Sequence, residues 1–161
     1  MPPPVTSRTT PLPALLSQVE SAFVSEFDRR LADSEFCALS FAHARNVLRH
    51  LDAGPERPAR LGELARVSKQ AISQQLTHLE ANGYVTVGPD PDDHRARVVR
   101  LTEKGAAAQQ LVSRTFDDIE RDWAVLAGDD GLTALRGPLE RLLGHVSASP
   151  AAPREVRSEC R

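Results

Sequence analysis

The pattern of apolar and polar positions predicts a mainly helical chain with one short β-hairpin. The clearest pattern lies between Leu61 and Thr102, where a short helix precedes a second, longer one. In the second helix Ile72, Leu76 and Leu79 recur at helical spacing and are expected to face a core. The side chains between them are polar, so we expect the other side of this helix to face solvent or a polar partner.

Boundary signals divide the rest of this segment. Ser68 is expected to cap the second helix and Asn82-Gly83 to end it, because glycine adopts the left-handed conformation at little cost. Tyr84–Val87 and Val98–Leu101 have the composition of paired strands, and Gly88–Asp93 between them has the composition of a turn. Two short helices followed by a two-stranded wing are typical of a DNA-binding head.

Two more helices are predicted before this helix-turn-helix segment. One begins at Pro13, and the other spans Phe41–Leu51 and is capped by Ser40. After a Gly- and Pro-rich break, Arg60-Leu61 is expected to add a short third strand to the wing sheet. The apolar stripe of the first helix consists of Leu15, Leu16, Val19, Phe23, Phe27 and Leu31.

Helices also follow the wing. Thr102 is expected to cap a helix whose apolar face continues to Leu126. A last apolar stripe spans Leu132–Val146, and Gly137-Pro138 inside it predicts a kink or two short pieces, because proline lacks an N–H and its ring clashes with the preceding turn. A single amphipathic helix cannot bury its own stripe, so we expect the terminal helices to pack against a second copy of the chain.

The predicted fold class is mainly α with a small β wing: a winged helix-turn-helix head flanked by N- and C-terminal dimerisation helices. Residues 1–12 are expected to form a disordered arm and residues 148–161 a flexible tail, because both lack apolar periodicity. A single domain is expected between them, at residues 13–147, with the head at about 40–102 and the dimerisation helices at about 13–37 and 103–147.

Polar side chains on the second head helix and basic side chains on the wing are the candidate DNA contacts. A helix start offers free N–H groups and positive charge to a phosphate. Gln pairs well with adenine edges in the major groove, where Ser, Thr and His also donate and accept, and an Arg on a wing can enter a narrow minor groove. The candidates are Ser68, Lys69, Gln70, Ser73, Gln74, Thr77 and His78 on the helix, and His94, Arg95 and Arg97 on the wing.

Composition narrows the class of protein. The formal net charge is −2, and the head is only slightly more basic than the rest, so tight DNA binding would need two heads or a concentrated patch. The cysteines, Cys37 and Cys160, lie far apart and form no disulfide framework, which fits a reducing cytosol. No apolar run approaches the length of a membrane span, so we expect a cytoplasmic protein without a membrane partner.

These segments resemble the multiple-antibiotic-resistance regulator (MarR) family of winged-helix repressors, over roughly residues 40–105. The most specific resemblance is the wing signature Asp90–Arg97 followed by the Leu-Thr-x-x-Gly step at Leu101–Gly105. Three earlier segments are also similar to family elements: Leu61–Ala65 to the helix before the turn, Ser68–Ser73 to the start of the recognition helix, and Leu79–Val85 to the exit into the wing.

The resemblance implies an obligate dimer, a pseudo-palindromic operator, and a small-molecule or oxidant signal that loosens DNA binding. Within the wing it implies that Asp93 and Arg95 form a salt bridge that holds the turn and presents a base to the minor groove. His94 departs from the Arg common at its position in the family. The resemblance also implies an effector pocket near the second helix, which makes Cys37 and His43 candidate lining residues.

The sequence gives weaker support for a redox sensor, a ligand cavity or a metal site. The apolar neighbours of Cys37 favour ordinary burial over redox sensing, and His43 is as well explained by a partly exposed helix face as by a ligand cavity. His43 and His50 are too far apart on one helix to chelate a metal without other ligands, so no metal site and no cofactor are predicted.

The acidic run in the wing is also better explained without a ligand. Asp90, Asp92 and Asp93 lack the spacing of a calcium loop and are expected to form a solvated turn that is salt-bridged to Arg95. No nucleophile elbow, phosphate-binding loop or other catalytic motif is present in the sequence, so an enzyme is not expected.

The predicted function is that of a sequence-specific double-stranded DNA-binding transcriptional regulator, a ligand-responsive repressor acting as a homodimer. Its expected partners are duplex DNA, a second copy of the chain and a small-molecule effector. Two alternatives stay open: a winged-helix protein–protein adaptor, and a small-molecule-binding protein without an operator. Salt-dependent binding to duplex DNA would separate the regulator from both.

Overall fold

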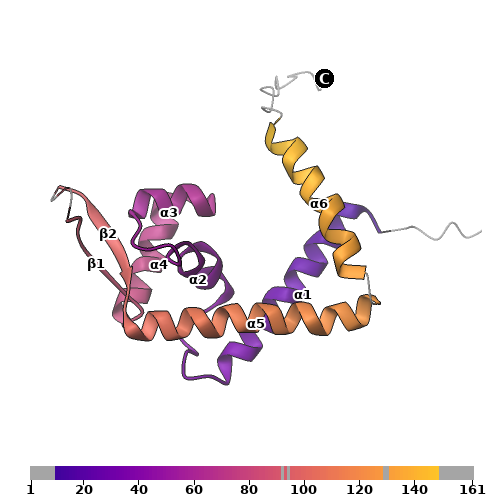
Figure 1. The fold of residues 1–161 in the computed structure, drawn as a ribbon, viewed down its shortest axis with the longest axis horizontal. Coiled ribbons are helices and arrows are strands. Elements are labelled where there is room, and N and C mark those ends of the chain that lie inside the picture. The colour runs from indigo at the N-terminus through magenta and orange to yellow at the C-terminus, as the bar shows by residue number, and fades with distance from the viewer. Residues whose placement is uncertain (1–9, 92, 94, 129–130, 149–161) are drawn as a thin grey trace, which may run out of the picture. The chain divides into compact units, whose positions relative to one another are not determined.

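The computed structural model describes residues 10–91, 93, 95–128 and 131–148 (Figure 1). Most of the predicted arm (1–12) and tail (148–161) lies outside the described residues. The contacts divide the chain into two units, Met1–Ile119 and Glu120–Arg161. The elements are α1 (Leu12–Ala32), α2 (Phe41–Asn46), the 3₁₀ turn η1 (Leu48–His50), α3 (Pro58–Ala65), α4 (Lys69–Ala81), β1 (Val85–Pro89), β2 (Arg97–Leu101), α5 (Glu103–Ala127) and α6 (Gly131–Ala148). The predicted fold class, mainly α with a small β wing, is confirmed.

The helix-turn-helix is formed by α3 and α4, which pack against each other in the first unit. Leu61 of α3 is completely buried, and so is Leu79 of α4. The turn between the helices passes through Arg66, whose φ of 55° places it in the left-handed region that ends α3. Ile72 and Leu76 are also buried, so the predicted inward stripe of α4 is confirmed.

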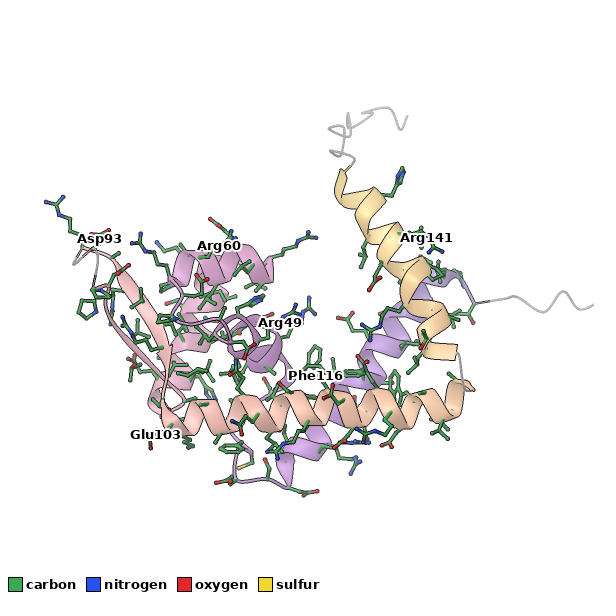
Figure 2. All side chains as sticks on the ribbon, in the orientation of Figure 1. Arg49, Arg60, Asp93, Glu103, Phe116 and Arg141 are labelled. Carbon is green, nitrogen blue, oxygen red and sulfur yellow. The ribbon has the colours of Figure 1, made fainter. Side chains whose placement is uncertain are left out.

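An aromatic cluster joins α1 and α2 to the first half of α5. The ring of Phe116 on α5 lies 4.8 Å from that of Phe27 on α1 and 5.8 Å from that of Phe41, the first residue of α2 (Figure 2). Phe23 stacks on the same Phe116 ring at 5.5 Å. These contacts use only the C-terminal part of the α1 stripe. The N-terminal part stays exposed, at 42–55% of its accessible area, and consists of Leu12, Leu15, Leu16 and Val19.

The second helix is shorter than predicted. α2 ends at Asn46 because Val47 leaves the helical region, with φ −124° and ψ −66°, and one 3₁₀ turn follows. Val47, Leu48 and Leu51 are nevertheless buried, as expected for an inward-facing stripe.

The wing is a two-stranded antiparallel sheet, in which Val85 pairs with Leu101 and Pro89 with Arg97. β1 therefore extends through Gly88 and Pro89, which the sequence predicted as turn. The proline is tolerated because it lies at the end of its strand, where a missing N–H interrupts no further pairing.

The predicted third strand at Arg60-Leu61 is wrong, because both residues lie in α3. Pro58 occupies the first turn of that helix, where its missing N–H costs nothing and its fixed φ suits a helix. The sheet is instead extended by an isolated bridge just before α3. Glu56 N–H donates to the carbonyl oxygen of Val99 at 3.1 Å, and Val99 N–H donates back at 2.8 Å.

In the second unit, α6 continues as one helix through Pro138 and is not divided into two pieces. The residue before a proline is normally pushed out of the helical region by a clash with its own Cβ, and Gly137 has no Cβ to clash. Arg136 Nη2 donates to Glu120 Oε2 at 2.7 Å. Three leucines of α6 remain exposed, at 52–65% of their accessible area: Leu135, Leu142 and Leu143.

Candidate nucleic-acid interface

The start and end of α4 are set by local hydrogen bonds. Ser68 Oγ accepts the backbone N–H of Ala71 at 3.1 Å, which confirms the predicted N-cap. At the other end Asn82 is the C-cap, and Gly83 takes a φ of 74°, the left-handed conformation that favours glycine. Both ends of the recognition helix are therefore defined by residues within the helix-turn-helix segment.

The outer face of α4 is polar and exposed, opposite the buried stripe. Its members are Lys69, Gln70, Ser73, Gln74 and Thr77. Thr77 Oγ1 donates to the carbonyl oxygen of Ser73 at 2.9 Å, so its hydroxyl can still accept. The amide groups of Gln70 and Gln74 carry both donors and acceptors, the chemistry that adenine presents in the major groove. Lys69 adds a positive charge at the helix start, where N–H groups can bind a phosphate.

His78 is also exposed, but its side chain is already engaged by groups outside α4. Its Nε2–H donates to the carbonyl oxygen of Ala38, in the loop before α2, at 2.7 Å. Its ring stacks on that of His43, with centroids 4.6 Å apart and planes 3° from parallel. The side chain is exposed and lies toward α2. The base-reading role of His78 stays a prediction.

The wing is held against α4 and presents Arg95 at its tip. Glu80 Oε1 of α4 accepts the N–H of Val87 at 3.0 Å. Arg97 Nη2 donates to the carbonyl oxygen of Val87 at 2.8 Å, so this predicted DNA contact is tied to β1 while remaining exposed. Arg95 is exposed. His94, also a predicted contact, lies outside the described residues.

The acidic residues of the wing pair differently from the prediction. Asp93 Oδ1 accepts the backbone N–H of Arg95 at 3.2 Å, and its carboxylate lies 3.7 Å from Arg57 Nη2. The described ion pair of Asp93 is thus with Arg57, not with the side chain of Arg95. Asp90, expected in a solvated turn, is only 7% exposed. It is buried because Arg57 Nε and Nη2 donate to its Oδ2 at 3.1 and 2.8 Å.

Arg57, which pairs with the acids of the wing, was not predicted as a site residue from the sequence. It lies 33 positions before Asp90, so no local spacing signal connects them. The sequence signal that could have suggested a buried ion pair here is Asp90 itself, an acid placed between two prolines in a turn.

A hollow lies between the start of α3, one side of α4 and the wing. Its volume is about 210 Å³, with Ile72 and Leu76 in its lining and polar side chains around them. A larger, open hollow of about 510 Å³ lies by the start of α3 and the wing, and its lining includes Arg57, Arg60 and Arg100. The polar lining of the first hollow consists of Lys69, Ser73, Thr77, Glu80 and Arg97.

The two candidate effector-pocket residues line neither hollow. Cys37 is a free, exposed cysteine, so the expected burial of this side chain is wrong; its neighbours Phe36 and Leu39 are buried in its place. His43 is half-buried, and its Nδ1 accepts the backbone N–H of Ser40 at 3.1 Å. Burial lowers the pKa of His43, and the neighbouring His78 lowers it further. His43 therefore caps α2 and packs on α4.

Potential metal ligands do not gather at one point in the described part of the chain. There, no three His, Cys, Asp or Glu side chains lie close enough together to hold a metal ion. None of the described helices is long and apolar enough to cross a lipid bilayer.

Sequence comparisons match the same head. A family model described as the MarR family matches residues 39–96. The HTH-type transcriptional repressor NicR of Pseudomonas putida is 29% identical over 93 residues, which cover 58% of this chain and 57% of that protein. The chain thus aligns with just over half the length of this curated relative.

Solved structures share the fold over most of the chain. FabT of Streptococcus pneumoniae, crystallised in complex with DNA, has a TM-score of 0.72 and 17% identity, covering 84% of this chain and 95% of that one. The reduced form of MarR from E. coli has a TM-score of 0.74 and 22% identity, covering 84% and 98%. These similarities confirm the winged-helix fold.

Proposed function

We propose that this chain, which belongs to the MarR family, is a sequence-specific duplex-DNA-binding transcriptional regulator that acts as a homodimeric repressor on a pseudo-palindromic operator. The observation that carries the proposal is the exposed polar face of α4, capped by Ser68 and flanked by a wing with Arg95 at its tip. The name of NicR describes a repressor, and FabT was crystallised with DNA, which supports the same activity here. The proposed activity is binding, not catalysis.

Three parts of the head have separate tasks in this proposal. Ser68 and Lys69 place the start of α4 on a backbone phosphate. Gln70, Ser73 and Gln74 read base edges in the major groove, with Thr77 at the edge of that face. The wing contacts the neighbouring minor groove or its phosphates through Arg95, and Arg97 supports it from β1.

A dimer is proposed because a single head carries little net positive charge with which to bind DNA. The chain has a formal net charge of −2, so affinity would have to come from two heads acting together. Exposed leucines on α1 and, in the other unit, on α6 are apolar surface of the kind that a second copy would cover. A two-fold dimer would place two α4 helices in successive major grooves, about 10 base pairs apart.

Response to a small molecule is the remaining part of the proposal. A ligand that binds one spacing of the two α4 helices better than another would shift the dimer toward that spacing. DNA affinity would fall whenever the favoured spacing no longer matches two half-sites. The ligand would act on the population of DNA-competent dimers and need not touch the DNA.

The experiment is selection of bound sequences by the purified full chain from a pool of random duplexes. We expect an inverted repeat with half-sites about one helical turn apart, and affinity that falls steeply with salt. Sedimentation of the free protein should give a dimer. A monomer in solution, or enrichment of no sequence even at low ionic strength, would contradict the proposed function and favour a protein-binding role for the same head.

A further inference from the structure

The guanidinium of Arg57 connects the start of α3 to the loop of the wing. Arg57 Nε and Nη2 both donate to Asp90 Oδ2, at 3.1 and 2.8 Å, and Nη2 lies 3.7 Å from the carboxylate of Asp93. Asp90 directly follows β1, and Asp93 lies farther along the loop (Figure 2). One side chain thus contacts two acids of the segment that carries Arg95.

The backbone beside Arg57 is already attached to the wing sheet. Glu56 and Val99 exchange two backbone hydrogen bonds, of 3.1 and 2.8 Å. Arg57 itself is the extended residue that precedes α3, with φ −77° and ψ 140°. The side chain therefore starts from a point that is fixed to β2 and reaches across to the end of β1.

The acids that Arg57 contacts in turn shape the loop. Asp90 N–H donates to the carbonyl oxygen of Ala96 at 2.9 Å, and Ala96 N–H donates to that of Asp93 at 2.8 Å. Asp93 Oδ1 accepts the backbone N–H of Arg95 at 3.2 Å. Hydrogen bonds to Asp90 and Asp93, the two acids that contact Arg57, therefore fix the backbone at Arg95 and Ala96.

We propose that Arg57 and Asp90 form a clamp that positions the wing loop, and that the clamp controls DNA affinity through Arg95 without contacting DNA itself. This inference rests on the proposed function, because it assigns Arg57 a positioning role in the same interface. Neither Arg57 nor Asp90 was a candidate site residue from the sequence.

Because Asp90 is buried, its carboxylate depends on Arg57. The side chain of Asp90 is only 10% exposed, and a buried carboxylate is costly unless it is paired and hydrogen-bonded. Arg57 supplies two N–H donors from one rigid plane, which a lysine ammonium cannot reproduce. Loss of either partner should therefore release the loop, and Lys should replace Arg57 only in part.

A direct phosphate contact by Arg57 predicts the opposite result for one variant. If Arg57 bound DNA, Asp90→Asn would remove a competing negative charge and strengthen binding. If the clamp positions the loop, Asp90→Asn and Arg57→Met should each weaken operator binding by about tenfold, and Arg57→Lys should weaken it less. Arg60→Met is the matched control, because it removes one positive charge three residues further along, in α3, and the ion pair that it breaks among the described residues is an exposed contact with Glu63 at 3.1 Å.

The role of Arg95 is tested by combining variants. In an Arg95→Ala background, Arg57→Met should cause no further loss of affinity, because the contact that the clamp positions is already gone. Equal and independent losses in both backgrounds would overturn the inference, and so would tighter binding by Asp90→Asn.

Amide hydrogen exchange tests the clamp without DNA. Asp90→Asn and Arg57→Met should accelerate exchange at the amides of Arg95 and Ala96, while those of α4 keep their protection and Arg60→Met changes neither. Unchanged exchange in the loop would overturn the clamp even if the protein binds DNA. A wild-type chain that binds no duplex would instead overturn the proposed function, and the exchange rates would still decide whether Arg57 holds the loop.

Discussion

Gly105 on α5 lies so close to Tyr84 that a Cβ at position 105 would overlap the carbonyl oxygen of Tyr84. That carbonyl also accepts the backbone N–H of Thr102 at 3.1 Å. Thr102 Oγ1 accepts the N–H of Gly105 at 2.9 Å, which confirms it as the N-cap of α5, and the same hydroxyl donates to the carbonyl oxygen of Gly83 at 2.6 Å. The Leu-Thr-x-x-Gly step thus joins α5 to the end of the recognition helix.

We expect Gly105→Ala to lower the free energy of unfolding by about 1–3 kcal/mol, because the added methyl group meets backbone, which cannot move aside as a flexible side chain could. Urea unfolding followed by circular dichroism would measure the change. Gly144→Ala in α6 is the control, because a methyl group added there would meet nothing within 4 Å and alanine favours a helix interior by about 0.5–1 kcal/mol. Equal effects at the two positions would contradict the close contact at Gly105.

Arg95→Ala should weaken operator binding by about tenfold and reduce the slope of log affinity against log salt by about one. The reason is the loss of one charged contact from the wing tip. Titration of the selected operator at several salt concentrations would measure both quantities. Arg114→Ala, at an exposed position of α5, removes the same charge outside the head and should leave the slope unchanged. An unaltered slope in Arg95→Ala would remove the wing tip from the interface.

Gln74→Ala should relax the preference for one base position of each half-site while leaving phosphate contacts in place. Its exposed amide on the outer face of α4 is placed to pair with an adenine edge. Repeating the selection from random duplexes would show the change as one less conserved position. The exposed Gln110 of α5 provides the matched Gln→Ala control. An unchanged sequence preference would move base reading to another residue of α4.

Stability should fall as the pH is lowered through the range below about 6.5, in part because of His43. Burial lowers the pKa of His43 below its ordinary value of 6.5, His78 lowers it further, and Asp28 opposes both. Between the lowered pKa of His43 and 6.5, the unfolded chain binds more protons than the folded one. The contribution of neutral His43 to the free energy of unfolding is therefore complete above that range, and it is lost as the pH falls through the range. Urea unfolding at a series of pH values would measure the slope of the free energy of unfolding against pH.

His43→Gln should make that slope shallower without removing the cap of α2. A glutamine at this position can still accept the N–H of Ser40, as in a capping box, but it does not titrate. The pKa of His50 is also lowered by burial, so His50→Gln is expected to remove a separate part of the same slope. A slope that is identical in His43→Gln and wild type would show that the half-buried ring does not control acid stability.

Local sequence signals determined the recognition helix and its limits. The Ser68 cap, the stripe of Ile72, Leu76 and Leu79, and the Asn82-Gly83 stop were all predicted and are found, because each depends on residues within one or two turns of the chain. The same holds for Thr102 at the start of α5. Which outward side chains touch DNA stays a prediction, because exposure alone does not identify a partner.

Tertiary structure decided the features that depend on residues far apart in sequence. Asp93 faces Arg57 because the segment before α3 pairs with β2, and the exposed His78 bonds to the loop before α2 because the carbonyl oxygen of Ala38 offers it an acceptor. Composition also misplaced Cys37, since apolar neighbours say nothing about which side chain of a turn faces solvent. Helix caps and apolar periodicity are local, so most of the helices, the two wing strands and the polar face of α4 could be predicted from the sequence, although some of their limits could not. Only the packed chain decided which charged and aromatic side chains meet, because those contacts depend on how the elements are brought together.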